Sequence, residues 1–307
     1  LPNKQYYMIL RHTLGQNVDI SHNGGYQLNG DTAANYAVRR GYIGASAGTN
    51  VNFNDIDLWD TGNVTNFHAA FISNIAGSEK LFYAQNNNQN TGGSSTAPYA
   101  VCITGKWANT TNAIDQITLK TLSANTWNTG SEVIVLGYDE SDTHTDSDNF
   151  WQELASADLS GGTSDDLSSG TFTAKKYLFV QAYTQYDTSN IACKLTFNGD
   201  TGTLYSISRS KDRAARVDEI NQTSIDTRGD NELRNWYHTM YIINNSGNEK
   251  LVNGNVTLAE SGAANYPNTT LYGAKWDNTS SQITEINFNN NAAGSYGTDS
   301  IIKVWGH

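Results

Sequence analysis

The stretch YQLNGDTAANYAVRR, residues 26–40, returns later in the chain as KLTFNGDTGTLYSISR, residues 194–209. In each copy a short apolar segment leads into Asn-Gly-Asp-Thr, and a second strand-like segment containing tyrosine follows. An Asn-Gly pair suits the type I′ turn of a hairpin, because both central residues of that turn need positive φ. The stretch therefore predicts two β-strands joined by a tight turn, and it predicts them twice.

The similarity continues on both sides of this stretch at an offset of about 170 residues, which indicates one ancestral domain duplicated in tandem. Each residue can thus be compared with its twin in the other copy. Shared positions are expected to specify the fold, and unshared positions are free for function. The matching pairs are 4–13 with 175–184, 66–81 with 236–251, 105–119 with 274–288, and 131–137 with 300–306.

The composition favours strands and turns over helices. Charged residues make up 16% of the 307 residues and methionine occurs twice, whereas glycine, asparagine, serine and threonine are abundant. About eight short strands in roughly 140 residues predict an all-β chain of two tandem duplicated β-sandwich domains with jelly-roll-like topology. We place the first copy at residues 1–138, an acidic linker and leading segment at 139–170, and the second copy at 171–307.

Charge and missing motifs exclude several classes of function. The net charge is −11 and no stripe of Lys and Arg with interleaved aromatics is present, so we expect no nucleic-acid partner. The sequence contains no run of about 18 apolar residues, so we predict no membrane span. Nucleophile-elbow, zinc-protease, P-loop, dinucleotide-binding and CxxC motifs are missing, so we expect no enzyme. No signal peptide is visible, and the start at Leu1 indicates that residues upstream were removed or left out.

The acidic run DESDTHTDSD opens the segment between the copies. Its Asp139, Asp142, Asp146 and Asp148 form the densest group of carboxylates and are a weak candidate calcium site. The run lacks the glycine and terminal glutamate of an EF-hand loop, so a solvated linker is the alternative. Calcium is therefore the one cofactor that the sequence leaves open.

The rest of the segment has no counterpart in the first copy, because Leu1 corresponds to about Phe172. Residues 151–159 are expected to form a short strand or a turn of helix that packs on the second domain. Either the leading strand of the first copy was lost before Leu1, or the first domain lacks it. We expect an open sheet edge there, to which a neighbouring subunit adds a strand.

Tryptophans are the remaining candidates for contact with a partner. Trp107 and Trp276 are twins and are assigned to the fold, whereas Trp59, Trp127 and Trp151 have no tryptophan twin. An indole offers a large, flat, apolar surface, so these three are candidate contacts for a subunit interface or a glycan. Packing within a core or an interface is the alternative.

Other reactive residue types recur in both copies and are interpreted as structural. We expect the histidines to serve the fold, the aspartates to serve the NGD turns, and the Glu-Lys pairs to be exposed ion pairs. Cys102 and Cys193 are not twins and are expected to be free, buried thiols. The shared residues are His68 and His238, Asp31 and Asp200, Glu79-Lys80 and Glu249-Lys250.

The stretch SSGTFTAKKYLFVQAYT, residues 168–184, and the KLTFNGDTGTLYSISRS that follows it resemble a repeated module of virion proteins. The module occurs in structural proteins of tailed double-stranded-DNA viruses of bacteria and archaea. The closing patterns I-x-x-I-x-L and S-x-x-x-V-x-G occur in the same kind of protein. The resemblance covers much of both copies. It implies a β-sandwich capsid decoration, fibre or tail-associated protein without catalytic residues.

The resemblance makes a non-enzymatic structural protein of a virion surface the first hypothesis. Its partners would be other copies of itself and other virion proteins. The alternatives are a carbohydrate-binding or adhesion module, with glycans as partners, and an extracellular filament subunit assembled by β-strand addition. All of these hypotheses place the chain on a virion surface or outside the cell.

Overall fold

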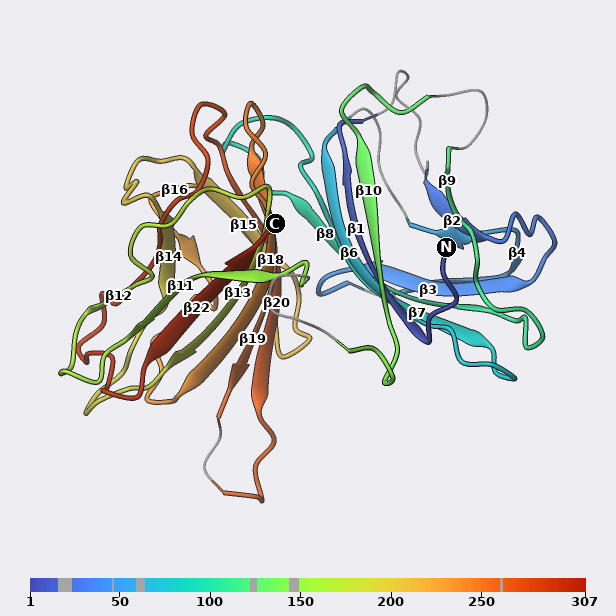
Figure 1. The fold of residues 1–307 in the computed structure, drawn as a ribbon. Helices are drawn as coiled ribbons and strands as arrows, with labels where there is room; N and C mark the ends of the chain where they lie inside the picture. Colours follow the sequence, from blue (N-terminus) through green and yellow to red (C-terminus); the bar gives the residue numbers. More distant parts are fainter. Residues whose placement is uncertain (16–23, 46, 59–63, 122–125, 144–148, 260–261) are drawn as a thin grey trace. The chain divides into compact units, whose positions relative to one another are not determined.

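The computed structural model describes residues 1–15, 24–45, 47–58, 64–121, 126–143, 149–259 and 262–307. The regular elements within these ranges are β-strands, and they form antiparallel sheets in two compact units (Figure 1). The predicted all-β fold of two tandem sandwich domains is confirmed. Within the same ranges, no helix is long and apolar enough to cross a membrane.

The first unit contains β1 (Tyr6–Thr13), β2 (Gly25–Leu28), β3 (Tyr36–Tyr42), β4 (Gly48–Phe53), β5 (Ile56–Asp57), β6 (Asn66–Ser73), β7 (Lys80–Asn88), β8 (Tyr99–Trp107), β9 (Ile117–Lys120) and β10 (Glu132–Tyr138). Its large sheet has the order β10-β1-β6-β7-β8-β3-β4, and its small sheet has the order β5-β2-β9. Alternate side chains of the sheets meet in one buried core, which includes Ile9, Tyr26, Ile56 and Trp107.

The second unit contains β11 (Gln152–Asp158), β12 (Asp166–Ser168), β13 (Tyr177–Thr184), β14 (Lys194–Phe197), β15 (Tyr205–Lys211), β16 (Val217–Gln222), β17 (Ile225–Asp226), β18 (Trp236–Ile243), β19 (Lys250–Leu258), β20 (Asn268–Trp276), β21 (Ile286–Asn289) and β22 (Ile301–Gly306). Its sheets have the orders β11-β22-β13-β18-β19-β20-β15-β16 and β12-β21-β14-β17. Apart from β11 and β12, each strand has a twin at the same place in the first unit, as the duplication predicts.

A shared set of hydrogen bonds holds the NGD turn in each unit. In the second unit, Trp276 Nε1 donates to Asp200 Oδ2 over 2.9 Å, and Tyr205 Oη accepts from the Phe197 amide over 3.0 Å. The first unit repeats these contacts between Trp107 and Asp31 over 2.7 Å, and between Tyr36 and Leu28 over 3.0 Å. The aspartate thus anchors a core tryptophan in addition to shaping its turn.

The NGD turns have the predicted backbone, but the two strands that each turn joins do not pair with each other. Asn29 and Gly30 have φ of 54° and 64°, as a type I′ turn requires. However, β2 lies in the small sheet and β3 in the large sheet, so the turn crosses between sheets and the predicted hairpin is wrong. The Asn29 carboxamide accepts from the amides of Asp115 and Gln116 and so ties this crossing to β9.

The prediction of exposed Glu-Lys pairs is also wrong. Lys80 and Lys250 are 1% and 0% exposed. Their ammonium groups donate to backbone carbonyls, Lys80 to Ser78 over 2.8 Å and Lys250 to Asn278 over 2.7 Å. Burial lowers the pKa of Lys250 to about 8. Both lysines serve the fold by capping loop carbonyls from inside.

The leading segment of the second copy closes one side of its sandwich. β11 pairs with β22 of the large sheet, and β12 pairs with β21 of the small sheet. Residues 151–159, expected as a strand or a turn of helix, are therefore mainly a strand. In the first unit the twins of β22 and β21 are β10 and β9, which are the last strands of their sheets among the described residues. That side of the first sandwich has no described strand beyond them.

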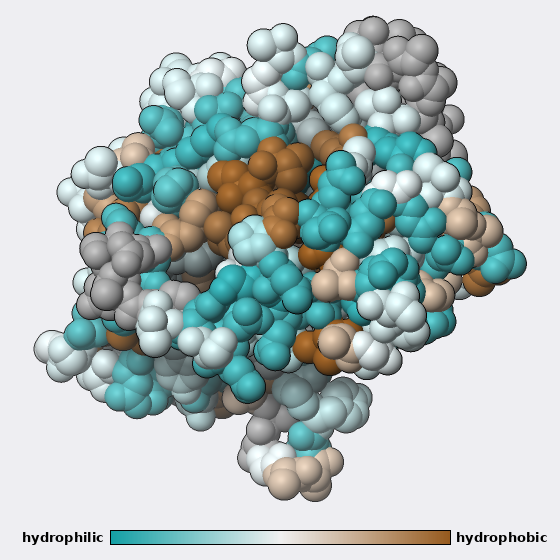
Figure 2. All heavy atoms as spheres, turned by 45° about the vertical axis from the view of Figure 1, so that its right-hand side comes forward, coloured by the Kyte–Doolittle hydropathy of each residue, from teal (hydrophilic) through white to brown (hydrophobic). Residues whose placement is uncertain are grey.

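This difference changes the exposure of the apolar residues beneath. Ile286, Phe288, Ile302 and Val304 of the second unit are each 0% exposed. Their twins in the first unit are Ile117, Leu119, Val133 and Val135. Val133 is 38% exposed, and the other three are half-buried. Figure 2 shows hydrophobic surface gathered on the face of the molecule that its view brings forward. The same core positions are thus fully buried in the second copy and only partly buried in the described part of the first.

The division into compact units adds one detail to the sequence-based boundaries. The first unit comprises Leu1–Asn90 and Tyr99–Thr143, and the second comprises Thr91–Pro98 and His144–His307. Within the second unit, Lys275 Nζ donates to the Thr91 carbonyl over 2.6 Å.

Candidate functional site

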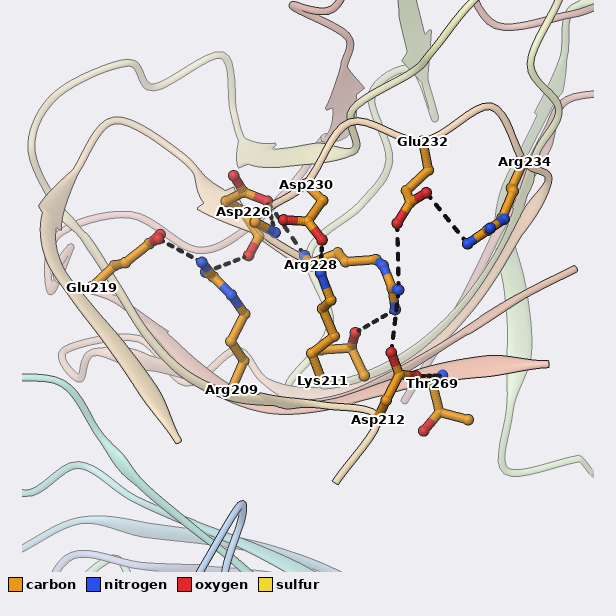
Figure 3. A network of polar contacts seen from close by, with 12 residues as sticks. Arg209, Lys211, Asp212, Glu219, Asp226, Arg228, Asp230, Glu232, Arg234 and Thr269 are labelled. Carbon is orange, nitrogen blue, oxygen red and sulfur yellow. Dashed lines mark hydrogen bonds and ion pairs between the residues drawn. The ribbon is translucent and has the colours of Figure 1, made fainter. Parts of the chain in front are cut away.

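A network of paired charges lies where β15 ends, β20 begins and the segment after β17 passes (Figure 3). Its centre is Arg228, whose side chain is 1% exposed. Arg228 Nη2 lies 3.4 Å from Asp212 Oδ2 and 3.5 Å from Glu232 Oε1, and Nη1 lies 3.4 Å from Thr270 Oγ1. A buried guanidinium is tolerated only when it is paired, and here two carboxylates supply the pairing.

Glu232 is held in place by its side chain and its backbone. Its second carboxylate oxygen, Oε2, lies 3.3 Å from Arg234 Nη1, so the carboxylate sits between two guanidinium groups (Figure 3). Its amide and carbonyl both hydrogen-bond to Ile191 over 2.9 Å. The orientation of Glu232 is therefore set before any ligand arrives.

Glu232 and Arg234 also line a cavity of about 580 Å³. This volume falls within the range of roughly 300–1,000 Å³ that is common for small-molecule sites. The lining combines amide side chains, an aromatic ring and two aliphatic side chains. The other lining residues are Tyr186, Asn190, Asn231, Leu233, Asn235 and Ala259.

Hydrogen bonds join the walls of the cavity to one another. Asn235 Oδ1 accepts from the Tyr186 amide over 3.3 Å, and the Asn235 carbonyl accepts from the Ala259 amide over 3.0 Å. The Ile191–Glu232 bridge ties the same two loops further along. The cavity is therefore preformed by the fold.

The part of the network that is centred on Arg228 is specific to the second copy, whereas Arg209 and Asp226 have the twins Arg40 and Asp57. At the twin positions of Lys211 and Asp212 the first copy has Tyr42 and Ile43. Arg228, two residues after β17, corresponds to Trp59. Sequence reasoning missed this site because its residues are spread over loops and match no motif. The comparison of twins gives a partial signal, because it marks Arg228 as unshared.

The three tryptophans singled out from the sequence do not form one site among the described residues. Trp59 lies outside the described residues. Trp127 lies beside the Arg11 guanidinium, which is 5.9 Å from its ring centroid in the first unit. Trp151 belongs to the second unit, where its ring lies 5.9 Å from Phe179 and 6.2 Å from Tyr241.

The surroundings of Trp127 contain polar groups buried inside the first sandwich. Arg11 and His68 are both 0% exposed, and His68 Nδ1 lies 3.3 Å from Tyr26 Oη. Burial, with a smaller contribution from the Arg11 charge, lowers the pKa of His68 well below its ordinary value. The twin of Arg11 is Ala182. Arg11 and His68 are buried within the core of the first unit, and neither lines the cavity.

The candidate calcium ligands are described only in part. Asp139 and Asp142 both pair with Lys4. The Lys4 ammonium donates a hydrogen bond to Asp142, and its Nζ lies 3.6 Å from Asp139 Oδ2. Asp146 and Asp148 lie outside the described residues. Where the structure describes the chain, no group of three or more His, Cys, Asp or Glu side chains is placed to hold a metal. The prediction of calcium for the whole run remains a prediction.

The two cysteines are free, as expected: Cys193 is buried and Cys102 is half-buried. Burial raises the pKa of the Cys193 thiol to about 12. A thiol held protonated in this way is a poor nucleophile.

Comparison with known proteins adds little to the geometry. No family model matches the chain, and no curated protein matches it. A solved structure of the mouse laminin alpha1 chain, domains LG4-5, aligns over 98% of this chain and 82% of its own length, with 8% identity and a TM-score of 0.20. A likeness at that TM-score carries no argument about fold or function.

Proposed function

We propose that this chain is a non-enzymatic structural subunit of a virion surface, which joins other copies or other virion proteins through the open side of its first sandwich. The resemblance of the repeated module supports the virion setting. The observation that carries the assembly contact is the contrast between twins. Val133 and Val135 in β10, and Ile117 in β9, are left partly uncovered where their twins are fully buried.

The second unit shows what would cover this side. β11 runs antiparallel to β22, and its residues Leu154, Ala155 and Ala157 pack against the core of the second unit. A strand added to β10 in the same direction would gain backbone hydrogen bonds and bury apolar surface. Completing the burial of the four partly covered residues, Ile117, Leu119, Val133 and Val135, is worth about 3–6 kcal/mol if each gains half of a full side-chain burial. This burial and the backbone hydrogen bonds of an added strand both favour a subunit contact at this side.

Val135→Lys is expected to abolish association of the purified chain. A charge pointing into the uncovered side blocks strand addition, as inward-pointing charges do on natural edge strands. Sedimentation velocity over a range of protein concentrations measures the association. The wild-type chain should form oligomers or larger assemblies, and the variant should remain monomeric.

Ile134→Lys is the matched control on the same strand. Its twin is Lys303, which pairs with Ser156 of β11 and lies 2.9 Å from Glu153. A lysine at this position is therefore compatible with an added strand, and association should persist. Circular dichroism verifies that both variants are folded. Association that survives Val135→Lys in a folded variant counts against the proposal.

The filament alternative uses the same contact with a different symmetry. A strand contributed head to tail generates an open filament, whereas a closed ring of contacts gives a discrete oligomer. Negative-stain electron microscopy of the assembled wild-type chain separates the two. Filaments in solution would favour an extracellular filament subunit over a virion surface protein.

A further inference from the structure

We propose that the cavity lined by Glu232 and Arg234 in the second unit binds a neutral saccharide. This inference goes beyond the assembly role and is independent of it, because the residues belong to a different unit and to no strand edge. It also assigns to the glycan alternative a location that differs from the tryptophans chosen from the sequence.

The charges of the cavity are already compensated. Glu232 lies between Arg228 and Arg234, and Arg228 also contacts Asp212. A metal ion would meet two guanidinium groups beside the carboxylate, which disfavours it. A phosphate would meet guanidinium groups whose charge is shared with carboxylates. An uncharged ligand fits this balance better than either ion.

Polar groups in the lining match the hydroxyl groups of a sugar. The side chains of Asn190 and Asn231 are exposed on the lining, and each carboxamide offers both a donor and an acceptor. The Glu232 carboxylate supplies a fixed acceptor, and Arg234 supplies a planar donor. Sugar hydroxyls both donate and accept, so a lining with several groups of both kinds suits them.

Apolar groups complete the match. The Tyr186 ring is half-buried in the wall, and Leu233 is 50% exposed. A pyranose ring presents apolar C–H faces between its hydroxyl groups, and an aromatic ring packs against such a face. The volume of about 580 Å³ accommodates a monosaccharide or a disaccharide. Size, charge balance and lining therefore point to the same class of ligand.

Saturation-transfer NMR on the full chain tests this proposal with methyl glycosides of glucose, galactose, mannose and N-acetylglucosamine. At least one glycoside should receive saturation from the wild-type protein. Asn231→Ala and Tyr186→Ala should each weaken its binding about tenfold or more, because each removes a direct contact. Inorganic phosphate should not displace the bound glycoside.

Two control variants locate the site. Asn291→Ala removes an exposed carboxamide of the same unit outside the cavity and should leave binding unchanged. Trp151→Ala should also leave it unchanged, because Trp151 does not line the cavity. The proposal is overturned if no glycoside receives saturation, if binding survives both cavity variants, or if Trp151→Ala alone abolishes it. Loss of assembly in Val135→Lys leaves these outcomes unaffected.

Discussion

Replacing Trp276 with alanine should lower the free energy of unfolding of the second unit by about 3–5 kcal/mol. The indole is 1% exposed, lies stacked with its ring centroid 6.3 Å from that of Tyr205, and donates to Asp200. Alanine leaves a cavity in the core and removes the partner of a carboxylate at the NGD turn. Urea unfolding followed by hydrogen exchange of β14 and β20 measures the loss in this unit.

The duplication supplies the matched variant. Trp107→Ala removes the twin indole, also 1% exposed, and should destabilise the first unit by a similar amount. Asp200→Ala, which removes only the acceptor, should cost about 1–3 kcal/mol because it leaves a buried indole N–H without its partner. A loss below about 1 kcal/mol for Trp276→Ala would show that the shared contact between tryptophan and the NGD turn does not stabilise the fold.

Acid should destabilise the second unit strongly, and His238→Leu should remove much of this sensitivity. His238 is fully buried, and burial lowers its pKa to about 3. The unfolded chain takes up this proton near pH 6.5, whereas the folded chain does so only near pH 3. The unfolded state therefore binds more protons between these values, and stability falls as the pH falls through this window. At pH 4.5 the cost is about 3 kcal/mol.

His238→Leu is a conservative change in this setting. Neither ring nitrogen of His238 has a hydrogen-bond partner among the described residues. The ring packs against Phe288, with 4.6 Å between the two ring centroids. Leucine therefore removes no side-chain hydrogen bond among the described residues. Urea unfolding at pH 7 and pH 4.5 should show a smaller difference for the variant than for the wild type. His307→Gln, at an exposed site, serves as the control, and an unchanged pH dependence in His238→Leu would contradict the expectation.

The duplication made much of the fold predictable, because each strand signal was read twice. Two hairpin partners at the sheet edges were missed: β4 and its twin β16 have exposed or half-buried residues throughout and no apolar alternation. The second half of the long β7 (Lys80–Asn88) also has no apolar alternation, because it runs through Gln85 and three asparagines. Polar residues buried in the middle of a sheet carry no periodic signal.

The shared residues were assigned correctly to the fold, but their roles differed from those expected. Asp200 was interpreted as a turn residue, and the structure adds its bond to Trp276, which lies 76 residues away. Lys250 was interpreted as exposed, although its ammonium is buried against loop carbonyls. Contacts of this kind depend on the order of strands in the sheets, and neither composition nor spacing reveals that order.

The candidate cavity could be foreseen only in outline. Comparison of twins marks Arg228 as unshared, but it does not show that Glu232 and Tyr186 lie on walls of one cavity. The expected open edge was closer to the observed structure. The segment without a twin pointed to it, and the described strands place β10 and β9 at that position.

Hydrogen exchange at β10, compared between the assembled and the dissociated chain, tests strand addition most directly. We predict that amides of Glu132–Tyr138 gain protection on assembly, because an added strand pairs with those that face away from β1. Amides of Ile301–Gly306 in β22 already lie between β11 and β13 and should be protected in both states. Equal exchange at β10 in the two states would contradict the assembly of this chain through the open side of its first sandwich.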